Sequence, residues 1–240
     1  MRNTNLITAG AICALLTTLS FVVGVAFSAG SGVQTIIPET GNDAIDWIND
    51  VDDAGGPFFI GAWFAILGGF LGLLALIGFW EALRDGGRLL ILAPILAVVG
   101  FTLVQISHLI PIAMAYELVP DYVEATGATK GSIASTADMF AVLALVVNYA
   151  GDVVLWGVVV PMYAYAALKT RVVGRWIGWL GFVVAFFAGW LGALAPASDA
   201  IGGITFIGFV GFFVWMAAMG VSLLLRERAA ASKTPTPASA

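Results

Sequence analysis

Charge is the first thing that this sequence lacks. Only 10% of its 240 residues are Asp, Glu, Lys or Arg, whereas 60% are hydrophobic. An ordinary soluble domain carries about 25% charged residues, so this chain has too little polar surface to remain in water. The composition therefore predicts an integral membrane protein whose main partner is the lipid bilayer, with no nucleic acid as a partner.

Cysteine and histidine are also scarce, with a single residue of each, Cys13 and His108. One cysteine cannot form an intrachain disulfide, and one histidine cannot provide both axial ligands of a bis-histidine haem. The several clustered ligands of a zinc hydrolase and the glycine loop with Lys of a phosphate-binding site are missing as well. We therefore expect no metal site, no cofactor and no catalytic residues, and a non-enzymatic protein is favoured.

Long apolar runs are what the sequence has in abundance. A helix needs about 20 mostly apolar residues to cross a hydrocarbon core of about 30 Å. Such runs predict an all-α bundle of six transmembrane helices at about 6–28, 58–83, 89–116, 139–168, 176–195 and 201–225. We expect one membrane domain over residues 1–228, an external loop at 29–57 and a disordered cytoplasmic tail at 229–240, because the tail is small, polar and proline-bearing.

The charges between these runs predict the orientation of the chain. Acidic connections alternate with basic turns such as "RDGGR" (84–88) and "KTRVVGR" (169–175), so nine of the ten basic residues fall on one side and only Lys130 on the other. An excess of Lys and Arg marks cytoplasmic loops. The pattern predicts a multi-pass protein of the plasma membrane with both termini in the cytoplasm.

The first apolar run has an alternative interpretation. Its basic start and the small residues Ala26 and Ser28 could suit a signal peptidase, and cleavage would leave five spans with an external N-terminus. The run of about 22 residues exceeds the usual 7–15 of a signal peptide, which favours an uncleaved helix.

Two further patterns concern surfaces. The segment "NDAIDWINDV" (42–51) predicts a short amphipathic helix in the external loop, with Ile45, Ile48 and Trp47 against the bilayer surface. Glycine is frequent, with 29 residues. Small residues let helices approach closely in lipid, so the glycine-rich helix faces predict packing seams inside the bundle, and a homo-oligomer through one of them is the alternative.

The polar residues inside the spans are the candidate site. Asp152 lies well inside the fourth span, about 26 Å above Lys169, with Asn148 four residues before it and Trp156 four residues after it on the same helical face. A charge there costs at least about 2.5–3.5 kcal/mol, so the carboxyl group must find a partner, a proton or the bundle interior.

The partner that the sequence predicts for Asp152 is His108. This histidine lies at nearly the same depth in the third span, about 30 Å beyond Arg88, and Gln105 and Ser107 add hydrogen-bonding capacity beside it. A hydrogen bond or ion pair between His108 and Asp152 is the most economical way to keep both in lipid.

The same constellation allows two interpretations. The first is interhelical polar packing, worth about 0.6–2 kcal/mol per contact. The second is a ligand-binding or proton-binding site formed by Asp152, His108, Asn148, Gln105 and Trp156, in which a coupled acid and base could bind and release a proton.

Two stretches resemble a known family. In "YAALKTRVVGRWIGWLG" (165–181) a span ends in a basic turn and the next begins with R-W-x-G-W-x-G, and "FWEALRD" (79–85) ends the second span. Both are similar to the prokaryotic membrane proteins grouped as "domain of unknown function 4386", although Gly174 stands where that family often has proline. The resemblance implies a six-helix bacterial or archaeal membrane protein and brings no activity or site residues with it.

The functional prediction from the sequence is therefore a multi-pass membrane protein with a non-enzymatic structural or interaction role. The alternative is a small proton-linked transporter or ligand-binding protein centred on Asp152 and His108. A polar cavity that reaches Asp152 would favour the alternative, and a sealed carboxyl group with both oxygens bonded would favour the structural role.

Overall fold

The protein is a bundle of helices, described by a computed structural model over residues 3–33, 43–197 and 199–232. Its main helices are α1 (Thr4–Ser31), α2 (Asp43–Ala54), α3 (Gly56–Leu83), α4 (Leu92–Glu124), α5 (Gly127–Val154), α6 (Val160–Thr170), α7 (Arg175–Val184) and α8 (Asp199–Ala231). Short segments join or interrupt them: the 3-10 turns η1 (Arg84–Gly86), η2 (Arg88–Ile91) and η5 (Gly192–Ala197), and the π-helical turns η3 (Leu155–Val159) and η4 (Ala185–Trp190).

Six helices in this described part of the chain are long and apolar enough to cross a membrane. They run over Thr4–Ser31, Gly56–Gly86, Arg88–Glu124, Gly127–Thr170, Arg175–Leu194 and Gly203–Ala231. The prediction of an all-α, multi-pass membrane bundle with six spans is confirmed. The end of the predicted tail, residues 233–240, lies outside the described residues, and α8 continues to Ala231, so it includes the first three residues of that tail.

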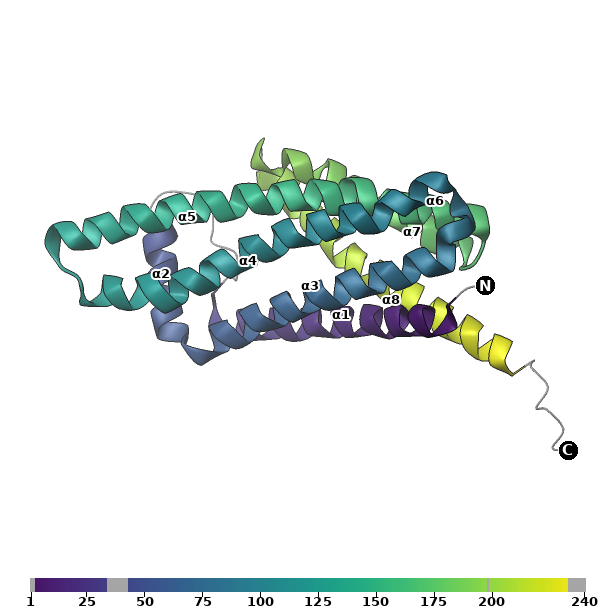
Figure 1. The fold of residues 1–240 in the computed structure, drawn as a ribbon. Helices are drawn as coiled ribbons and strands as arrows, with labels where there is room; N and C mark the ends of the chain where they lie inside the picture. The colour runs from purple at the N-terminus through teal and green to yellow at the C-terminus, as the bar shows by residue number, and fades with distance from the viewer. Residues whose placement is uncertain (1–2, 34–42, 198, 233–240) are drawn as a thin grey trace, which may run out of the picture.

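The third and fourth spans are longer than the sequence predicted. The stretch 117–138 was expected to be an external loop, but α4 continues to Glu124 and α5 begins at Gly127, so the two form a helical hairpin joined at Ala125 and Thr126. Figure 1 shows this hairpin extending past the ends of α1 and α3. At about 1.5 Å per residue, the 33 residues of α4 measure about 50 Å, more than a bilayer core requires.

The short helix α2 is amphipathic, as predicted, but its apolar face does not lie on the bilayer surface. Trp47 and Ile48 are 3% and 0% exposed, and they belong to one buried cluster with Val119 and Tyr122 of α4. In Figure 1, α2 lies across the end of the bundle, between α3 and the α4–α5 hairpin. The prediction was wrong because the extended hairpin offers α2 a protein surface, which removes Trp47 and Ile48 from solvent more completely than a headgroup layer would.

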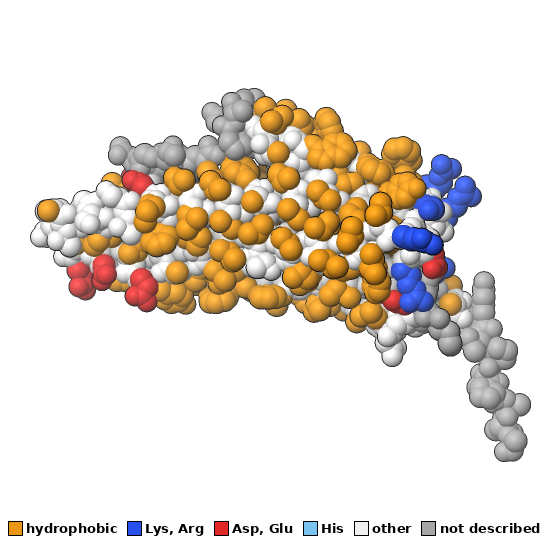
Figure 2. All heavy atoms as spheres, turned by 45° about the horizontal axis from the view of Figure 1, so that its top comes forward, with side chains coloured by type: hydrophobic (Ala, Val, Ile, Leu, Met, Phe, Trp, Pro, Cys, Tyr) orange, Lys and Arg blue, Asp and Glu red, His pale blue; other side chains and the backbone are white. Residues whose placement is uncertain are grey.

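The two ends of the molecule differ in charge. Figure 2 shows Lys and Arg side chains gathered at one end, with Asp and Glu side chains concentrated on the hairpin end of the same face. The first group comes from the basic turns and from the end of α8, whose Arg226 donates to the carbonyl oxygen of Val172 at 3.2 Å. We call these the basic end and the acidic end. Basic residues at one end and acidic residues at the other are what the predicted alternation of basic turns and acidic connections requires.

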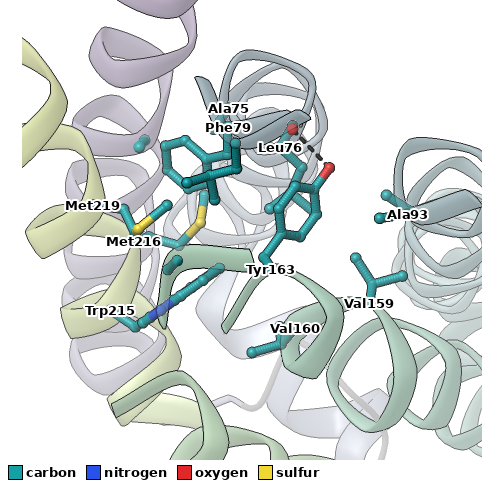
Figure 3. Packing of buried hydrophobic residues seen from close by; sticks show 14 of the residues in the cluster. Ala75, Leu76, Phe79, Ala93, Val159, Val160, Tyr163, Trp215, Met216 and Met219 are labelled. Carbon is teal, nitrogen blue, oxygen red and sulfur yellow. Dashed lines mark hydrogen bonds between the residues drawn. The ribbon is translucent and has the colours of Figure 1, made fainter. Parts of the chain in front are cut away.

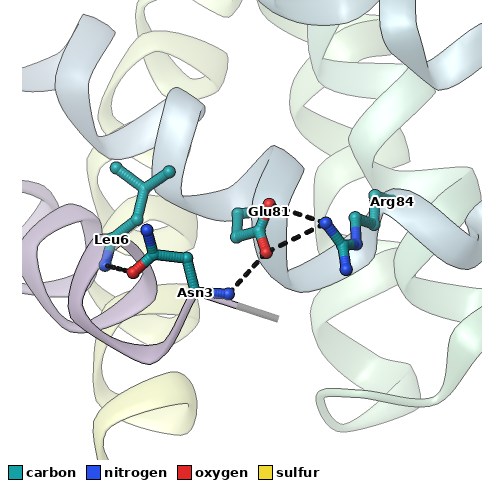
Figure 4. A network of polar contacts seen from close by, with 4 residues as sticks. All are labelled: Asn3, Leu6, Glu81 and Arg84. Atoms are coloured by element: carbon teal, nitrogen blue, oxygen red, sulfur yellow. Dashed lines mark hydrogen bonds and ion pairs between the residues drawn. The ribbon is translucent and has the colours of Figure 1, made fainter. Parts of the chain in front are cut away.

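A buried polar cluster closes the basic end between α1 and α3 (Figure 4). Glu81 is only 4% exposed. Its Oε1 accepts from the backbone N–H of Asn3 at 2.6 Å, and Arg84 pairs with the same carboxylate at 3.2 Å. The side chain of Asn3 caps α1 by accepting from the N–H of Leu6. The carboxylate of Glu81 thus lies at the N-terminus of α1, where the helix dipole favours negative charge. The Glu81–Arg84 pair therefore also anchors the start of α1.

Close backbone approach holds the helices together. A Cβ atom on Gly78 of α3 would lie 2.6 Å from the Cα of Gly10 of α1, and one on Gly151 of α5 would lie 2.9 Å from the carbonyl oxygen of Gly100 of α4. No side chain fits at such contacts. These glycines therefore form packing seams within this chain, and a homo-oligomer through a glycine-rich face stays a prediction.

The core is divided along the bundle. A large apolar cluster fills the half near the basic end, where Phe79, Tyr163 and Trp215 are fully buried and Tyr163 donates to the carbonyl oxygen of Leu76 at 2.8 Å (Figure 3). A second cluster lies at the acidic end, under α2. Between the two clusters the packing is interrupted, and this is where the polar residues of the candidate site lie.

Candidate functional site

The five candidate residues come from two neighbouring helices and the turn that follows one of them. His108 and Gln105 are on α4, Asn148 and Asp152 are on α5, and Trp156 is in the π-helical turn η3. All five line one or both of two adjoining cavities. The structure thus brings together every residue that the sequence singled out.

Asparagine, not histidine, holds Asp152. Asn148 Nδ2 donates to Asp152 Oδ2 at 2.7 Å, across one turn of α5. Asn148 Oδ1 in turn lies 2.9 Å from the hydroxyl of Ser107 on α4, which links the two helices. The polar stripe predicted on α5 is therefore a hydrogen-bonded chain that runs from Ser107 through Asn148 to Asp152.

The predicted pair between His108 and Asp152 is absent from the described hydrogen bonds and ion pairs, and that prediction was wrong. His108 Nδ1 lies 2.7 Å from the carbonyl oxygen of Val104, one turn back on its own helix. This oxygen is within reach of the imidazole without any movement of the helices, whereas Asp152 already has Asn148 on its own face. His108 and Asp152 line the same cavity, but lining one cavity does not decide which group a side chain bonds.

The contact of His108 with Val104 fixes the proton on its ring. A carbonyl oxygen can only accept, so Nδ1 carries the hydrogen. In the neutral imidazole, Nε2 is then left as an acceptor. Because His108 borders both cavities, this second nitrogen is placed to meet a hydrogen-bond donor there.

The larger cavity has a volume of about 650 Å³ and lies between α1, α3, α4, α5 and α8. Its polar lining consists of Ser20, Ser28, His108, Asn148, Asp152 and Thr205, and its aromatic lining of Phe21, Trp156, Phe206 and Phe209. Along α1 it reaches from Ser20 to Gly32, which is about 18 Å of helix toward the acidic end. A mainly apolar cavity with several polar side chains in its wall therefore reaches Asp152.

The smaller cavity, of about 90 Å³, continues from the larger one toward the packed core. His108 and Trp156 border both, while Gln105 borders only the smaller one. Gln105 itself is buried against Gly69 of α3, where a Cβ atom would overlap its amide group. Gln105 is thus part of the inner wall and does not contact Asp152.

Several polar atoms at these cavities have no hydrogen-bond partner. Among the described residues, five buried side-chain atoms are in this position, and three of them are Asp152 Oδ1, Trp156 Nε1 and Gln105 Oε1. An unpaired polar atom in an apolar interior costs about 1–3 kcal/mol, and native proteins rarely tolerate it. Three of the five atoms thus belong to residues that line this one pair of cavities.

The helix carrying Asp152 changes geometry immediately after it. Residues 155–159 form the π-helical turn η3, which packs against the second π-helical turn, η4. A Cβ atom on Gly189 would overlap the backbone nitrogen of Gly157, and Trp190 Nε1 donates to the carbonyl oxygen of Gly157 at 2.9 Å. π-helical turns are rare and occur often at functional sites. Here one of them turns Trp156 toward Phe209 and Phe212, with ring centroids 5.3 Å and 5.9 Å away.

The sequence interpretation missed the wall that α1 and α8 provide. Ser20, Gly24, Ser28 and Gly32 recur every four residues, so they form one small and partly polar face of α1, and all four line the larger cavity. That spacing was visible in the sequence. The sequence did not show which helices this face of α1 is turned toward, because spacing along one helix does not reveal its neighbours.

No three His, Cys, Asp or Glu side chains of the described residues lie together as a metal site would require. The groups that the described cavity wall presents are polar and aromatic. One carboxylate oxygen and one imidazole nitrogen are free to accept, hydroxyl groups can donate or accept, and aromatic rings form the rest of the wall.

Comparison of this chain with protein-family models, with curated proteins and with solved structures finds no match. The resemblance of its helix ends to the "domain of unknown function 4386" proteins stays a prediction. What can be concluded about function therefore rests on the geometry of the cavity.

Proposed function

We propose that this multi-pass membrane protein binds a small organic cation with an apolar body in the cavity at Asp152. The observation that carries the proposal is that a cavity of about 650 Å³ reaches a carboxyl group of which only one oxygen is hydrogen-bonded within the protein. The ligand-binding alternative is thereby favoured over the purely structural or interaction role.

The lining suits a cation better than an anion. Asp152 Oδ1 and His108 Nε2 are acceptors, and no Lys or Arg lines the cavity. A protonated amine could donate to the carboxylate while its apolar part lies against Phe21, Phe206 and Phe209. Aromatic faces also attract cations, by about 0.5–2 kcal/mol each.

Binding is better supported than transport. Toward the basic end the cavities stop at the cluster around Phe79, Tyr163 and Trp215, where side chains are fully buried. A proton-linked transporter would have to open this cluster in each cycle. Proton-linked transport of the bound cation is the second candidate function. Uptake of an organic cation into proteoliposomes under a pH gradient would test it.

The test of binding uses 4-phenylbutylamine, with 4-phenylbutan-1-ol as its neutral partner. In detergent, the amine should raise the midpoint of thermal unfolding in a concentration-dependent way, and the alcohol should do so less. Asp152→Asn keeps the shape of the side chain but removes its charge, so its dissociation constant for the amine should rise at least about tenfold.

Asp138→Asn is the matched control for this test. It makes the same change on the same helix, fourteen residues before Asp152, at a residue that does not line the cavity. Its affinity for the amine should equal that of the unmodified protein. Equal affinity of all three proteins, or no shift with any of them, would contradict the proposal and leave the structural role.

The orientation that we propose places the acidic end outside and the basic end, with both termini, in the cytoplasm of a cell whose plasma membrane holds the protein. With Cys13 replaced by alanine, a cysteine at Asp50 should react with a membrane-impermeant maleimide on intact cells. A cysteine at Arg171 should react only after permeabilisation. The reverse pattern would overturn the orientation without affecting the six spans.

A further inference from the structure

The two basic turns of the sequence meet at a third cavity, which lies at the basic end and away from the two cavities near Asp152. Gly86 of the first turn packs on α6, where a Cβ atom would lie 2.6 Å from the Cβ of Ala166, three residues before Lys169. Between them lies a groove of about 690 Å³. The turns "RDGGR" and "KTRVVGR" are far apart in the chain, so only the fold places them side by side.

The mouth of this groove carries two cations. Arg88 and Lys169 both line it, both are exposed, and neither forms an ion pair with another described residue. Gly87 has φ 148°, a conformation that favours glycine, and Lys169 Nζ lies close to this turn, 3.7 Å from where a Cβ atom of residue 87 would be. Asp85 belongs to the same turn but does not line the groove. The charge at the mouth is therefore positive.

The floor of the groove is apolar. From Arg88 it follows α4 past Leu92 to Leu96, and Val158, Met162 and Phe182 form its other side. Seven residues of helix separate Leu89 from Leu96, which is about 10 Å. Leu89 is 74% exposed and Leu92 is 45% exposed, so the groove lies open along the surface that the bilayer would cover. Cations at one end and an apolar channel beneath them match a phosphate headgroup with an acyl chain.

We propose that the groove between Arg88 and Lys169 binds an anionic phospholipid, with the phosphate between the two cations and an acyl chain along Leu92 and Leu96. Basic pockets between transmembrane helices on the cytoplasmic side recognise such headgroups. The first turn of the helix that begins at Arg88 lines the groove, and its dipole adds positive potential there. A soluble phosphate compound would not need the apolar channel. The site does not depend on the cavity at Asp152.

The experiment measures lipid binding to the full chain in detergent by native mass spectrometry, with phosphatidylglycerol and phosphatidylcholine of identical acyl chains. The double variant Arg88→Ala/Lys169→Ala should bind phosphatidylglycerol roughly thirtyfold more weakly, because each basic residue near an anionic lipid contributes about fivefold. Its binding of phosphatidylcholine should not change. Both side chains are exposed, so thermal unfolding should be unaltered and will verify that the variant is folded.

The double variant Arg226→Ala/Arg228→Ala is the matched control. It removes the same charge from the same end, but these residues are on α8 and do not line the groove. It should bind phosphatidylglycerol as the unmodified protein does. An equal loss in both double variants would mean general surface attraction, and no loss in either would mean no site; both results overturn the proposal. Leu96→Trp, which blocks the channel and leaves the charges, should also weaken binding, and unchanged binding would contradict the acyl-chain placement.

Discussion

Replacing Gly189 with valine is expected to destabilise the bundle more than any other single change considered, by at least about 3 kcal/mol. Even a Cβ atom at this position would overlap the backbone of Gly157 and come 2.6 Å from the carbonyl carbon of Trp156. Backbone atoms cannot move aside as a flexible side chain can. The two π-helical turns would have to separate, which would also break the bond from Trp190 to Gly157. Thermal or denaturant unfolding in detergent measures the loss.

Gly203→Val is the control for this prediction. Gly203 is in α8, and a Cβ atom there meets nothing within 4 Å. The same substitution should therefore change the unfolding free energy by less than about 1 kcal/mol. Equal effects at the two positions would mean that the close contact of η3 with η4 does not contribute to stability.

Replacing Asn148 with leucine is expected to cost about 1–3 kcal/mol of stability, because it removes the donor to Asp152, whereas the hydroxyl of Ser107 keeps the carbonyl oxygen of Val104 as an acceptor at 2.7 Å. Asp152 would then have neither oxygen bonded within the described structure. A carboxyl group without a partner inside a bilayer protein is costly. Unfolding of the purified protein in detergent, without added ligand, provides the measurement.

The double variant Asn148→Leu/Asp152→Leu separates the stabilising role of this pair from its role in binding. Replacing both partners by apolar groups removes the unpaired carboxyl group, so most of the lost stability should return. Binding of 4-phenylbutylamine should stay lost in the double variant. If the double variant were as unstable as Asn148→Leu, the cost would arise from packing and not from the orphaned acid.

The helical bundle could be predicted because its causes are local. Twenty apolar residues cross a membrane whatever their neighbours are, and basic turns mark one side of it. The bond between Asn148 and Asp152 is equally local, since residues four apart share one helical face. These features needed only the spacing of residues along one helix.

What could not be predicted depends on how helices pack. His108 and Asp152 line the same cavity, but the imidazole is hydrogen-bonded to a carbonyl oxygen on its own helix. Trp47 was expected on the bilayer and is instead buried against the hairpin, because the helices extend further than hydropathy indicates. The cavity itself lies where α1 and α8 stand apart from α5, which depends on how the helices pack. The one sign of it in the sequence is the spacing of Ser20, Gly24 and Ser28, which recur every four residues on the face of α1 that lines the cavity.

The most direct test of the proposed cavity is the reactivity of a cysteine placed at Ala65, in a protein whose Cys13 is alanine. Ala65 of α3 lines both cavities, whereas Ala75 of the same helix is fully buried in the packed core. A small, charged methanethiosulfonate should modify Ala65→Cys in the folded protein, 4-phenylbutylamine should slow the reaction, and Ala75→Cys should not react. If Ala65→Cys reacts only after unfolding, or if the amine leaves its rate unchanged, the cavity at Asp152 is not an accessible binding site.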